Sequence, residues 1–252
     1  MEWQHAGAVL FDLDGVLTPT AEVHMRAWEQ LFNSVLDRLP EDVRADRSPY
    51  TDEDYFHHVD GRPRYEGVQA FLRSRGIDLP QGTPEDSPEQ VTVCGLGNRK
   101  NVLFNEILDA EGIEPYPGSV ALLDDLERRD TPAAVVTSSR NGPHVLRTAG
   151  LAERFGVLVD GSVATEQGLA GKPEPDTFRY AAEQLGVEPE RCAVIEDAVS
   201  GVTAGARGGF GIVVGVDRGV GADTLRRAGA DVVVTDLAQL LPTDGPVSQP
   251  HA

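Results

Sequence analysis

Cysteine and long apolar runs are both scarce in this chain of 252 residues. The two cysteines, Cys94 and Cys192, are too few for a disulfide framework and lack the spacing of metal ligands, so each is expected to be a small buried hydrophobe. No apolar run approaches the roughly 20 residues of a membrane helix. Residues 1–15 also lack the basic start and apolar stretch of a signal peptide. The sequence therefore predicts a cytoplasmic protein without a membrane partner.

Positive charge is scarce as well, because 22 basic residues stand against 41 acidic ones and the formal net charge is −19. This balance excludes a nucleic-acid partner, since a phosphate backbone would be repelled and no basic patch stands out to overcome the repulsion. Among the basic residues only Lys100 and Lys172 are lysines. An arginine-rich coding background explains the bias, but it leaves open why these two positions are not arginine.

What the sequence does contain is an alternation of short apolar segments and helical patterns. Strands are expected at Ala8–Phe11, Ala133–Thr137, Val157–Asp160, Cys192–Glu196, Gly211–Val216 and Asp231–Val234. Helical spacing lies between them, at Ser119–Arg129, Pro143–Ala149, Asp176–Leu185, Ser200–Arg207 and Ala222–Ala228. Such an alternation predicts an α/β fold with a Rossmann-like parallel sheet, helices on both faces, and functional groups at the carboxyl ends of the strands.

The long stretch at 20–115 contains no Val-rich strand of this kind. Amphipathic helical patterns occur in it at Glu22–Leu36, Val68–Arg75 and Arg99–Glu111. The sequence therefore predicts an inserted α-helical domain at 20–115 and a core domain formed by 1–19 and 116–241. The Pro- and Gly-containing tail at 242–252 is expected to be disordered.

Two carboxylates follow the first expected strand. Asp12 and Asp14 are two residues apart in an extended segment, so their side chains face the same way at the mouth of the sheet. Solvated loop acids are one alternative, and a calcium loop is another. A calcium loop needs further oxygen ligands at regular positions, and the residues after Asp14 (Gly-Val-Leu) supply none. The strand context therefore favours a catalytic role.

Three other strand-end loops add complementary chemistry. Thr137 and the residues after it offer hydroxyls, backbone amides and a guanidinium for an anion, Lys172 precedes a helix between prolines, and Glu196 and Asp197 end another strand. Carboxylate oxygens are the ligands that Mg²⁺ prefers, and a metal with a lysine can neutralise phosphoryl oxygens. A carboxylate can also attack phosphorus as a nucleophile. Together these loops predict a site for Mg²⁺ and a phosphate, with an aspartyl-phosphate formed on Asp12.

These segments resemble the four motifs of the haloacid dehalogenase superfamily: FDLDGV, the hydroxyl after VV, GKPEPD and VIEDAVSG. The resemblance runs from about Ala8 to Leu241. It implies that Asp12 is the nucleophile, that Asp14 is the general acid/base whose carbonyl also meets Mg²⁺, and that Thr137 and Lys172 clamp the phosphate. Glu196 and Asp197 would be the acids beside the metal. The helical insert corresponds to the cap domain of this superfamily.

Within the superfamily, the segments DGVLTPTAEVHMRAW, GNRKN and TSSRNGP are similar to the β-phosphoglucomutase group. This resemblance implies a hinge at Thr20 and a cap histidine, His24, close to the general acid/base. It also implies a set of residues that recognise substrate and its second phosphate: Arg64, Lys100, Ser138, Ser139, Arg140 and Asn141. The adjacent His57 and His58 are not expected to bind a metal, because neighbouring residues on a helix point to different faces.

The leading functional hypothesis is an Mg²⁺-dependent sugar phosphomutase that converts β-glucose 1-phosphate to glucose 6-phosphate through the bisphosphate. A phosphatase shares every core motif, and a non-catalytic sugar-phosphate-binding protein is a more distant alternative. The expected partners are a sugar phosphate and a sugar bisphosphate, and the expected state is a monomer. The resemblance departs at Asp60 and Gly67, where similar enzymes carry a basic residue and a hydroxyl, so the identity of the sugar stays open.

Overall fold

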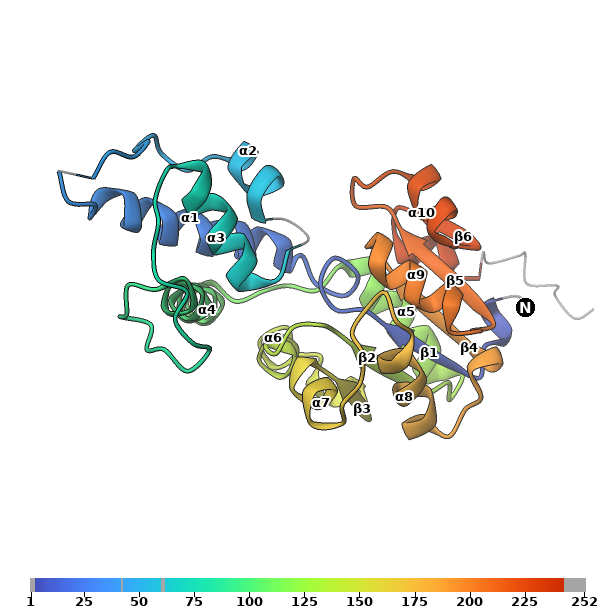
Figure 1. Cartoon of the computed structure of the whole chain (residues 1–252). Helices are drawn as coiled ribbons and strands as arrows, with labels where there is room; N and C mark the ends of the chain where they lie inside the picture. The colour runs from blue at the N-terminus through green and yellow to red at the C-terminus, as the bar shows by residue number, and fades with distance from the viewer. Residues whose placement is uncertain (1–2, 42, 60–61, 243–252) are drawn as a thin grey trace, which may run out of the picture. The chain divides into compact units, whose positions relative to one another are not determined.

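The computed structural model describes residues 3–41, 43–59 and 62–242. The chain forms two compact units, of which the core unit contains Met1–Pro19 and Ile113–Ala252 and the cap unit contains Thr20–Gly112 (Figure 1). The sequence pattern predicts the second junction slightly later, at residue 115. Asp60 and the tail at 243–252 lie outside the described residues. Within the described ranges no helix is both long enough and apolar enough to span a bilayer.

The core unit is built on a six-stranded sheet in the order β3-β2-β1-β4-β5-β6, and every strand pair is parallel. The strands are β1 (Ala8–Phe11), β2 (Ala133–Val136), β3 (Val157–Val159), β4 (Cys192–Glu196), β5 (Ile212–Val216) and β6 (Val232–Val234). The predicted α/β fold with a parallel, Rossmann-like sheet is confirmed. The central strands β1 and β2 are apolar throughout and β4 is apolar up to its last residue, Glu196, as expected for strands that helices cover on both faces.

Helices and short turns connect the strands of the core unit (Figure 1). The helices are α5 (Pro117–Arg128), α6 (Gly142–Thr148), α7 (Gly161–Glu166), α8 (Asp176–Leu185), α9 (Val199–Arg207) and α10 (Ala222–Ala228). Short helical turns occur at Trp3–His5, Ala152–Arg154, Pro189–Arg191 and Leu237–Leu240. The short helix α7 was not predicted. It begins where the carboxylate of Asp160 accepts from the backbone N–H groups of Ser162 and Val163, a cap that no apolar periodicity announces.

Strand order decides which loops meet. β1 pairs with β2 on one side and with β4 on the other. Thr137 directly follows β2, Asp12 directly follows β1, and Glu196 is the last residue of β4. Because parallel strands share one carboxyl edge, these three side chains come from adjacent positions at that edge.

The cap unit consists of helices, as expected. They are α1 (Thr20–Asp37), α2 (Asp52–Asp54), the π-helical turn η2 (Tyr55–Val59), α3 (Arg64–Ser74) and α4 (Val93–Glu111). α4 begins at Val93 rather than Arg99, because Thr92 caps it by accepting from the N–H of Gly95 and so offsets two early glycines. An aromatic cluster around Phe32 and Phe71, whose ring centroids are 4.0 Å apart, forms its core.

A buried arginine stabilises the cap unit. The side chain of Arg75 is 8% exposed and donates to Asp46 at 2.9 Å and to Asp54 at 2.6 Å. Removing one member of a buried pair leaves uncompensated charge, although the exposure of Asp46 weakens this effect.

We expect Arg75→Met to lower the free energy of unfolding of the cap unit by about 2 kcal/mol in urea titration. The exposed neighbour Arg73→Met is the control, and equal losses in the two variants would contradict the bracing role.

Candidate active site

Asp12 lies at the centre of the carboxyl edge of the sheet. Its backbone N–H donates to the carbonyl of Ile195 at 2.9 Å, which continues the β1–β4 ladder by one residue. The side chain is buried, and its Oδ1 accepts from the Nζ of Lys172 at 2.5 Å. The predicted nucleophile is therefore held in place both by the sheet and by a buried cation.

Lys172 comes from the loop between α7 and α8, and its side chain is 6% exposed. The ammonium donates to Asp12, to Glu196 Oε1 at 2.8 Å and to the carbonyl of Val136 at 2.9 Å. Burial alone would lower the pKa of Lys172, but the charges of Asp12 and Glu196 outweigh it and raise this pKa above its usual value. The lysine is thus a permanent cation between two carboxylates.

Glu196 is 1% exposed, and both of its oxygens have partners. Oε1 accepts from Lys172, and Oε2 accepts from the N–H of Ala198 at 2.8 Å. The carboxylate fills the space beside Gly201, where an added Cβ would lie 1.6 Å from Oε1. Only glycine at 201 leaves room for this orientation of Glu196.

Asp14 and Asp197 meet around a tight turn. Gly15 has a φ of 82°, and a Cβ there would lie 2.0 Å from Asp197 Oδ2. Glycine is therefore required twice, for its backbone conformation and for the close approach of the carboxylate. On the other side of the turn, Thr137 Oγ1 donates to Asp14 Oδ2 at 3.3 Å.

Carboxylate charge accumulates at this edge. Burial, followed by the charges of Glu196 and Asp14, raises the pKa of Asp197 to about 7. Burial also raises the pKa of Asp12 well above its ordinary value, while Lys172 acts in the opposite direction. One lysine does not balance so many acids, so the site favours an additional cation.

The residues fit a hard divalent cation. One oxygen from each of Asp12, Glu196 and Asp197 lies within 4.8 Å of the others, in the kind of all-oxygen set that Mg²⁺ prefers. The side chain of Asp14 is not in this group, and its contribution through the backbone carbonyl stays a prediction. His57 and His58 are likewise not in this group, the one metal-compatible cluster found among the described residues.

The loop after β2 combines a buried and an exposed part. Thr137 is buried, whereas Ser138 and Arg140 are exposed, and Arg140 donates to Thr165 on α7. The backbone amides of Ser139 and Asn141, expected to be exposed for an anion, instead donate to hydroxyls of the same loop: Ser139 N–H to Thr137 Oγ1 and Asn141 N–H to Ser139 Oγ, both at 3.1 Å. These two amides are therefore already engaged within the loop.

The cap unit brings together a second set of predicted residues. Lys100 is 4% exposed and contacts His24 Nδ1, and its Nζ lies about 5 Å from the rings of Trp28 and Phe104. His24 stacks on Phe104 with ring centroids 4.3 Å apart. Burial and then the charges of Lys100 and Arg64 lower the pKa of His24 well below its ordinary value. The imidazole is neutral near pH 7. Thr20, the predicted hinge residue, is buried at the first position of α1.

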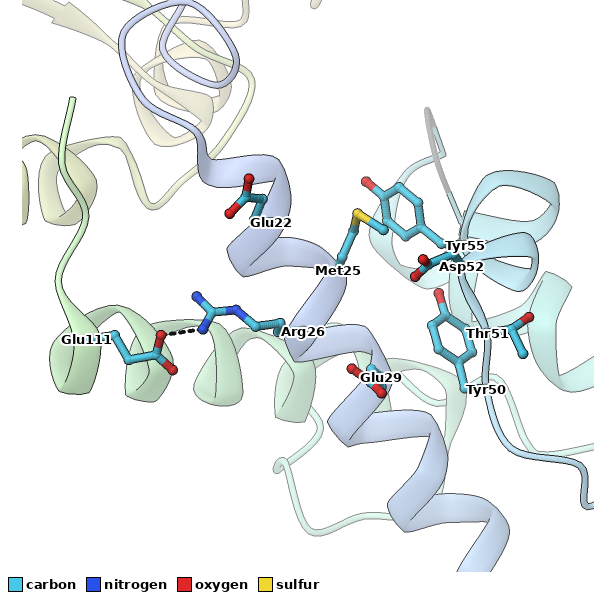
Figure 2. A pocket seen from close by; sticks show the side chains of 9 residues that line it. All are labelled: Glu22, Met25, Arg26, Glu29, Tyr50, Thr51, Asp52, Tyr55 and Glu111. Carbon is cyan, nitrogen blue, oxygen red and sulfur yellow. Dashed lines mark hydrogen bonds and ion pairs between the residues drawn. The ribbon is translucent and has the colours of Figure 1, made fainter. Parts of the chain in front are cut away.

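A separate groove of about 480 Å³ lies in the cap unit between α1 and the segment 50–55. Figure 2 shows Glu22, Arg26 and Glu29 along one face of α1, and Arg26 pairs with Glu111. Helical periodicity puts His24 on the opposite face of α1. With its one arginine already paired and acids along its rim, this groove does not suit a phosphate, and none of the predicted site residues lines it.

Comparison with known proteins identifies the family. The model of the haloacid dehalogenase-like hydrolases matches residues 6–209. The chain belongs to this family. It is 47% identical to the β-phosphoglucomutase of Mycobacterium bovis over 93% of this chain and 91% of that protein. It is 27% identical to hexitol phosphatase A of Escherichia coli, covering 94% of each chain. The crystal structure of a Clostridium difficile β-phosphoglucomutase superposes with a TM-score of 0.70 at 26% identity, over 94% of this chain and 93% of that one.

Membership of the haloacid dehalogenase-like family and the close β-phosphoglucomutase relatives make this chain an enzyme of the phosphotransferase class. The predicted superfamily and fold are confirmed. The roles of the individual residues in this chain stay predictions.

The sequence pattern pointed to the charged groups that the structure brings together at this edge, but not to the residues that support them. The sequence pattern assigned no role to Gly201 or to the backbone N–H of Ala198. Neither residue carries a charge or a nucleophile, and their roles depend on where Glu196 lies. The exclusion of a Cβ at 201 becomes visible only when the strand end and the following helix are placed in space.

A substitution at Gly201 tests the packing around Glu196. An added methyl would overlap Glu196 Oε1, which cannot rotate away without losing Lys172 and the N–H of Ala198. We expect Gly201→Ala to lower kcat by about 100-fold, since misplacing a catalytic group by about 1 Å costs that much. Gly156→Ala is the control, because nothing lies within 4 Å of a Cβ there. Retention of full activity by a folded Gly201→Ala variant would contradict the proposed packing.

The depressed pKa of His24 predicts a pH dependence of stability. Below pH 6.5 the unfolded chain takes up a proton at this residue that the folded chain does not, so folding becomes less favourable as the pH falls. The free energy of unfolding of the wild type should fall when the pH is lowered from about 7.5 to about 5.5. We expect this fall to be about 1 kcal/mol smaller in His24→Gln, as measured by urea titration at each pH. The exposed His57→Gln serves as the control. A His24→Gln curve that parallels the wild-type curve over this range would refute the assignment.

Proposed function

We propose that this protein is an Mg²⁺-dependent sugar phosphomutase that converts β-glucose 1-phosphate to glucose 6-phosphate through the 1,6-bisphosphate. The observation that carries the proposal is the contact of Lys172 with both Asp12 and Glu196 at the edge of the sheet, with Asp197 beside them. The similarity to the β-phosphoglucomutase of M. bovis supports the same substrate class.

In this proposal the carboxylate of Asp12 attacks the phosphorus of the bound sugar phosphate, and an aspartyl-phosphate forms as the bond to the sugar oxygen breaks. Asp14 donates a proton to the leaving oxygen and later accepts one from the hydroxyl that takes the phosphoryl group back. The hydrogen bond from Thr137 to Asp14 at 3.3 Å orients this second carboxylate.

Asp12 and Asp197 are the residues that would hold Mg²⁺, with Glu196 next to them and the backbone carbonyl of Asp14 as a further ligand. When bound, the metal supplies positive charge that neutralises the phosphoryl oxygens and lowers the pKa of the surrounding carboxylates. Lys172 and Thr137 complete the clamp on the phosphoryl group. Such preorganised charge acts most strongly where water is excluded, and the side chain of Lys172 is 6% exposed.

A mutase must also hold the phosphate that is not being transferred. We assign this role to side chains of the loop after β2 and of the cap unit: Ser138, Ser139, Arg140, Asn141, Arg64 and Lys100. Thr20 would lie at the hinge, and His24 close to Asp14. The exposed guanidinium of Arg140 is available to an anion, since its hydrogen bond to Thr165 at 3.3 Å uses a single nitrogen.

A phosphatase is the second candidate, and the similarity to E. coli hexitol phosphatase A favours it. In that case water rather than a sugar hydroxyl would accept the phosphoryl group from Asp12. A non-catalytic binding protein is disfavoured by the buried charges, because gathering Asp12, Glu196 and Lys172 away from water is costly and binding alone does not need it.

A product assay separates these functions. The wild type, incubated with Mg²⁺, β-glucose 1-phosphate and a trace of the 1,6-bisphosphate, should form glucose 6-phosphate. Asp12→Asn should lower the rate by at least about 1,000-fold, because an amide is a far weaker nucleophile than a carboxylate. Asp223→Asn, at a side chain that is 85% exposed, is the control. Inorganic phosphate in place of glucose 6-phosphate would establish the phosphatase instead, and turnover by Asp12→Asn would refute the nucleophile.

The surroundings of Lys172 predict that replacing it by arginine impairs activity although the charge is kept. Its Nζ donates to three oxygens in a buried space, and a planar guanidinium is larger and cannot take this compact geometry. We expect Lys172→Arg to lower kcat by about 100-fold while the protein stays folded. The reverse change at an exposed position, Arg226→Lys, should leave kcat unchanged. Equal activity of Lys172→Arg and wild type would show that charge alone suffices at this position.

A further inference from the structure

The loop after β5 holds Arg218, an arginine outside the cluster of Asp12, Lys172, Glu196 and Asp197. Asp217 Oδ1 accepts from the N–H groups of Gly219 and Gly221 at 2.9 and 3.0 Å, and the N–H of Asp217 donates to Val234 at 2.8 Å. These bonds fix the turn from which Arg218 extends. The side chain of Arg218 therefore extends from a turn that hydrogen bonds hold in place at the carboxyl edge of the sheet.

The guanidinium of Arg218 contacts three separate segments of the core unit. Nε donates to the carbonyl of Gly15 at 2.8 Å, and Nη1 donates to the carbonyl of Thr235, just after β6, at 3.1 Å. Its Cζ lies 3.8 Å from the ring centroid of Tyr116. Nη2 is buried, and no partner for it is found among the described residues. Within the part of the chain that the structure describes, the contacts of this cation are to backbone carbonyls and an aromatic ring.

Arg218 acts on a turn that carries the chemistry. Gly15 lies between Asp14 and the carboxylate of Asp197, which packs into the space where a Cβ would be. Its N–H donates to the carbonyl of Thr18 at 2.8 Å, so the bond from Arg218 holds the other end of the same residue. A shift of Gly15 would displace both Asp14 and Asp197.

The same arginine also contacts the segment around Tyr116, near the point where the chain re-enters the core unit at Ile113. The N–H of Tyr116 donates to Leu17 at 2.9 Å, and Ser119 Oγ donates to Val16 at 2.7 Å. Arg218 stacks on Tyr116 and so closes this arrangement from the side of β5. One guanidinium therefore joins the turn after β1 to the segment that follows Gly112.

We propose that Arg218 is a positioning residue for phosphoryl transfer, which holds the Asp14–Gly15 turn against Tyr116. The inference deepens the proposed function and rests on it. Only arginine suits the position, because its planar group stacks on a ring face while its edge donates to two carbonyls. The ammonium of a lysine can donate to a carbonyl, but it has no planar group to stack on the ring and no fixed pair of N–H donors for two carbonyls.

The kinetic test compares Arg218→Met and Arg218→Lys with Arg226→Met. Arg226 lies on α10 in the same β5–β6 connection, and its side chain is 56% exposed. Hydrolysis of p-nitrophenyl phosphate and the mutase reaction are both measured. For Arg218→Met we expect kcat to fall about 30-fold in each reaction, with KM for p-nitrophenyl phosphate changed less than about threefold, since the turn positions catalytic groups rather than binding substrate. Arg218→Lys should recover less than half of this loss.

Tyr116→Leu supplies a second, independent variant. It removes the stacking surface and leaves both hydrogen bonds of Arg218 possible. If the two residues act together, the loss of kcat in the double variant Arg218→Met/Tyr116→Leu should be smaller than the product of the single losses. Losses that multiply would show that Arg218 and Tyr116 act separately and would overturn the proposed coupling.

Hydrogen exchange provides a readout that does not depend on any substrate. In Arg218→Met, peptides covering residues 12–19 and 113–120 should exchange at least about fivefold faster than in the wild type, while β4 peptides stay unchanged. Arg226→Met should exchange like the wild type. Unchanged exchange in both peptides would overturn the inference, as would faster exchange with full kcat. A wild type without mutase activity would refute the proposed function alone, because hydrolysis and exchange would still report on Arg218.

Discussion

The contacts of the Lys172 ammonium with Asp12 and Glu196 are the interaction on which the candidate site depends. Two buried carboxylates at adjacent strand ends would repel each other strongly, and the lysine between them offsets this repulsion. The neighbouring groups serve this arrangement. The N–H of Ala198 orients Glu196, Gly201 leaves space for it, and the β1–β4 ladder holds Asp12.

The charge of this cluster explains why the site suits both a divalent cation and a phosphoryl group. Lys172 alone does not balance Asp12, Glu196 and Asp197, and burial together with the charges of Glu196 and Asp14 raises the pKa of Asp197 to about 7. A bound divalent cation would offset this excess and would supply positive charge for phosphate oxygens. A protein with a net charge of −19 can therefore handle anionic substrates, provided that its positive charge is concentrated at the site.

Both lysines of the chain lie in confined surroundings where their shape matters. Lys172 donates to three oxygens, and Lys100 contacts His24 between the rings of Trp28 and Phe104. An ammonium is compact enough for such places, whereas a guanidinium is flat and extended. Arg218 is the complementary case, because stacking on Tyr116 while donating to two carbonyls requires the flat group. At these three positions the choice between lysine and arginine thus follows from local geometry.

The sequence by itself determined the sheet, most helices and the charged residues of the site, because apolar periodicity and acids at strand ends are local patterns. It missed α7, the turn at Asp52–Val59 and the start of α4, where capping by Asp160, Thr51 and Thr92 replaces periodicity. Only the tertiary structure decided that Gly201 must be a glycine and that Arg218 meets Gly15. The space around Gly201 and the hydrogen bond from Arg218 to Gly15 depend on atoms that folding brings together from different segments, so no pattern within one segment predicts them.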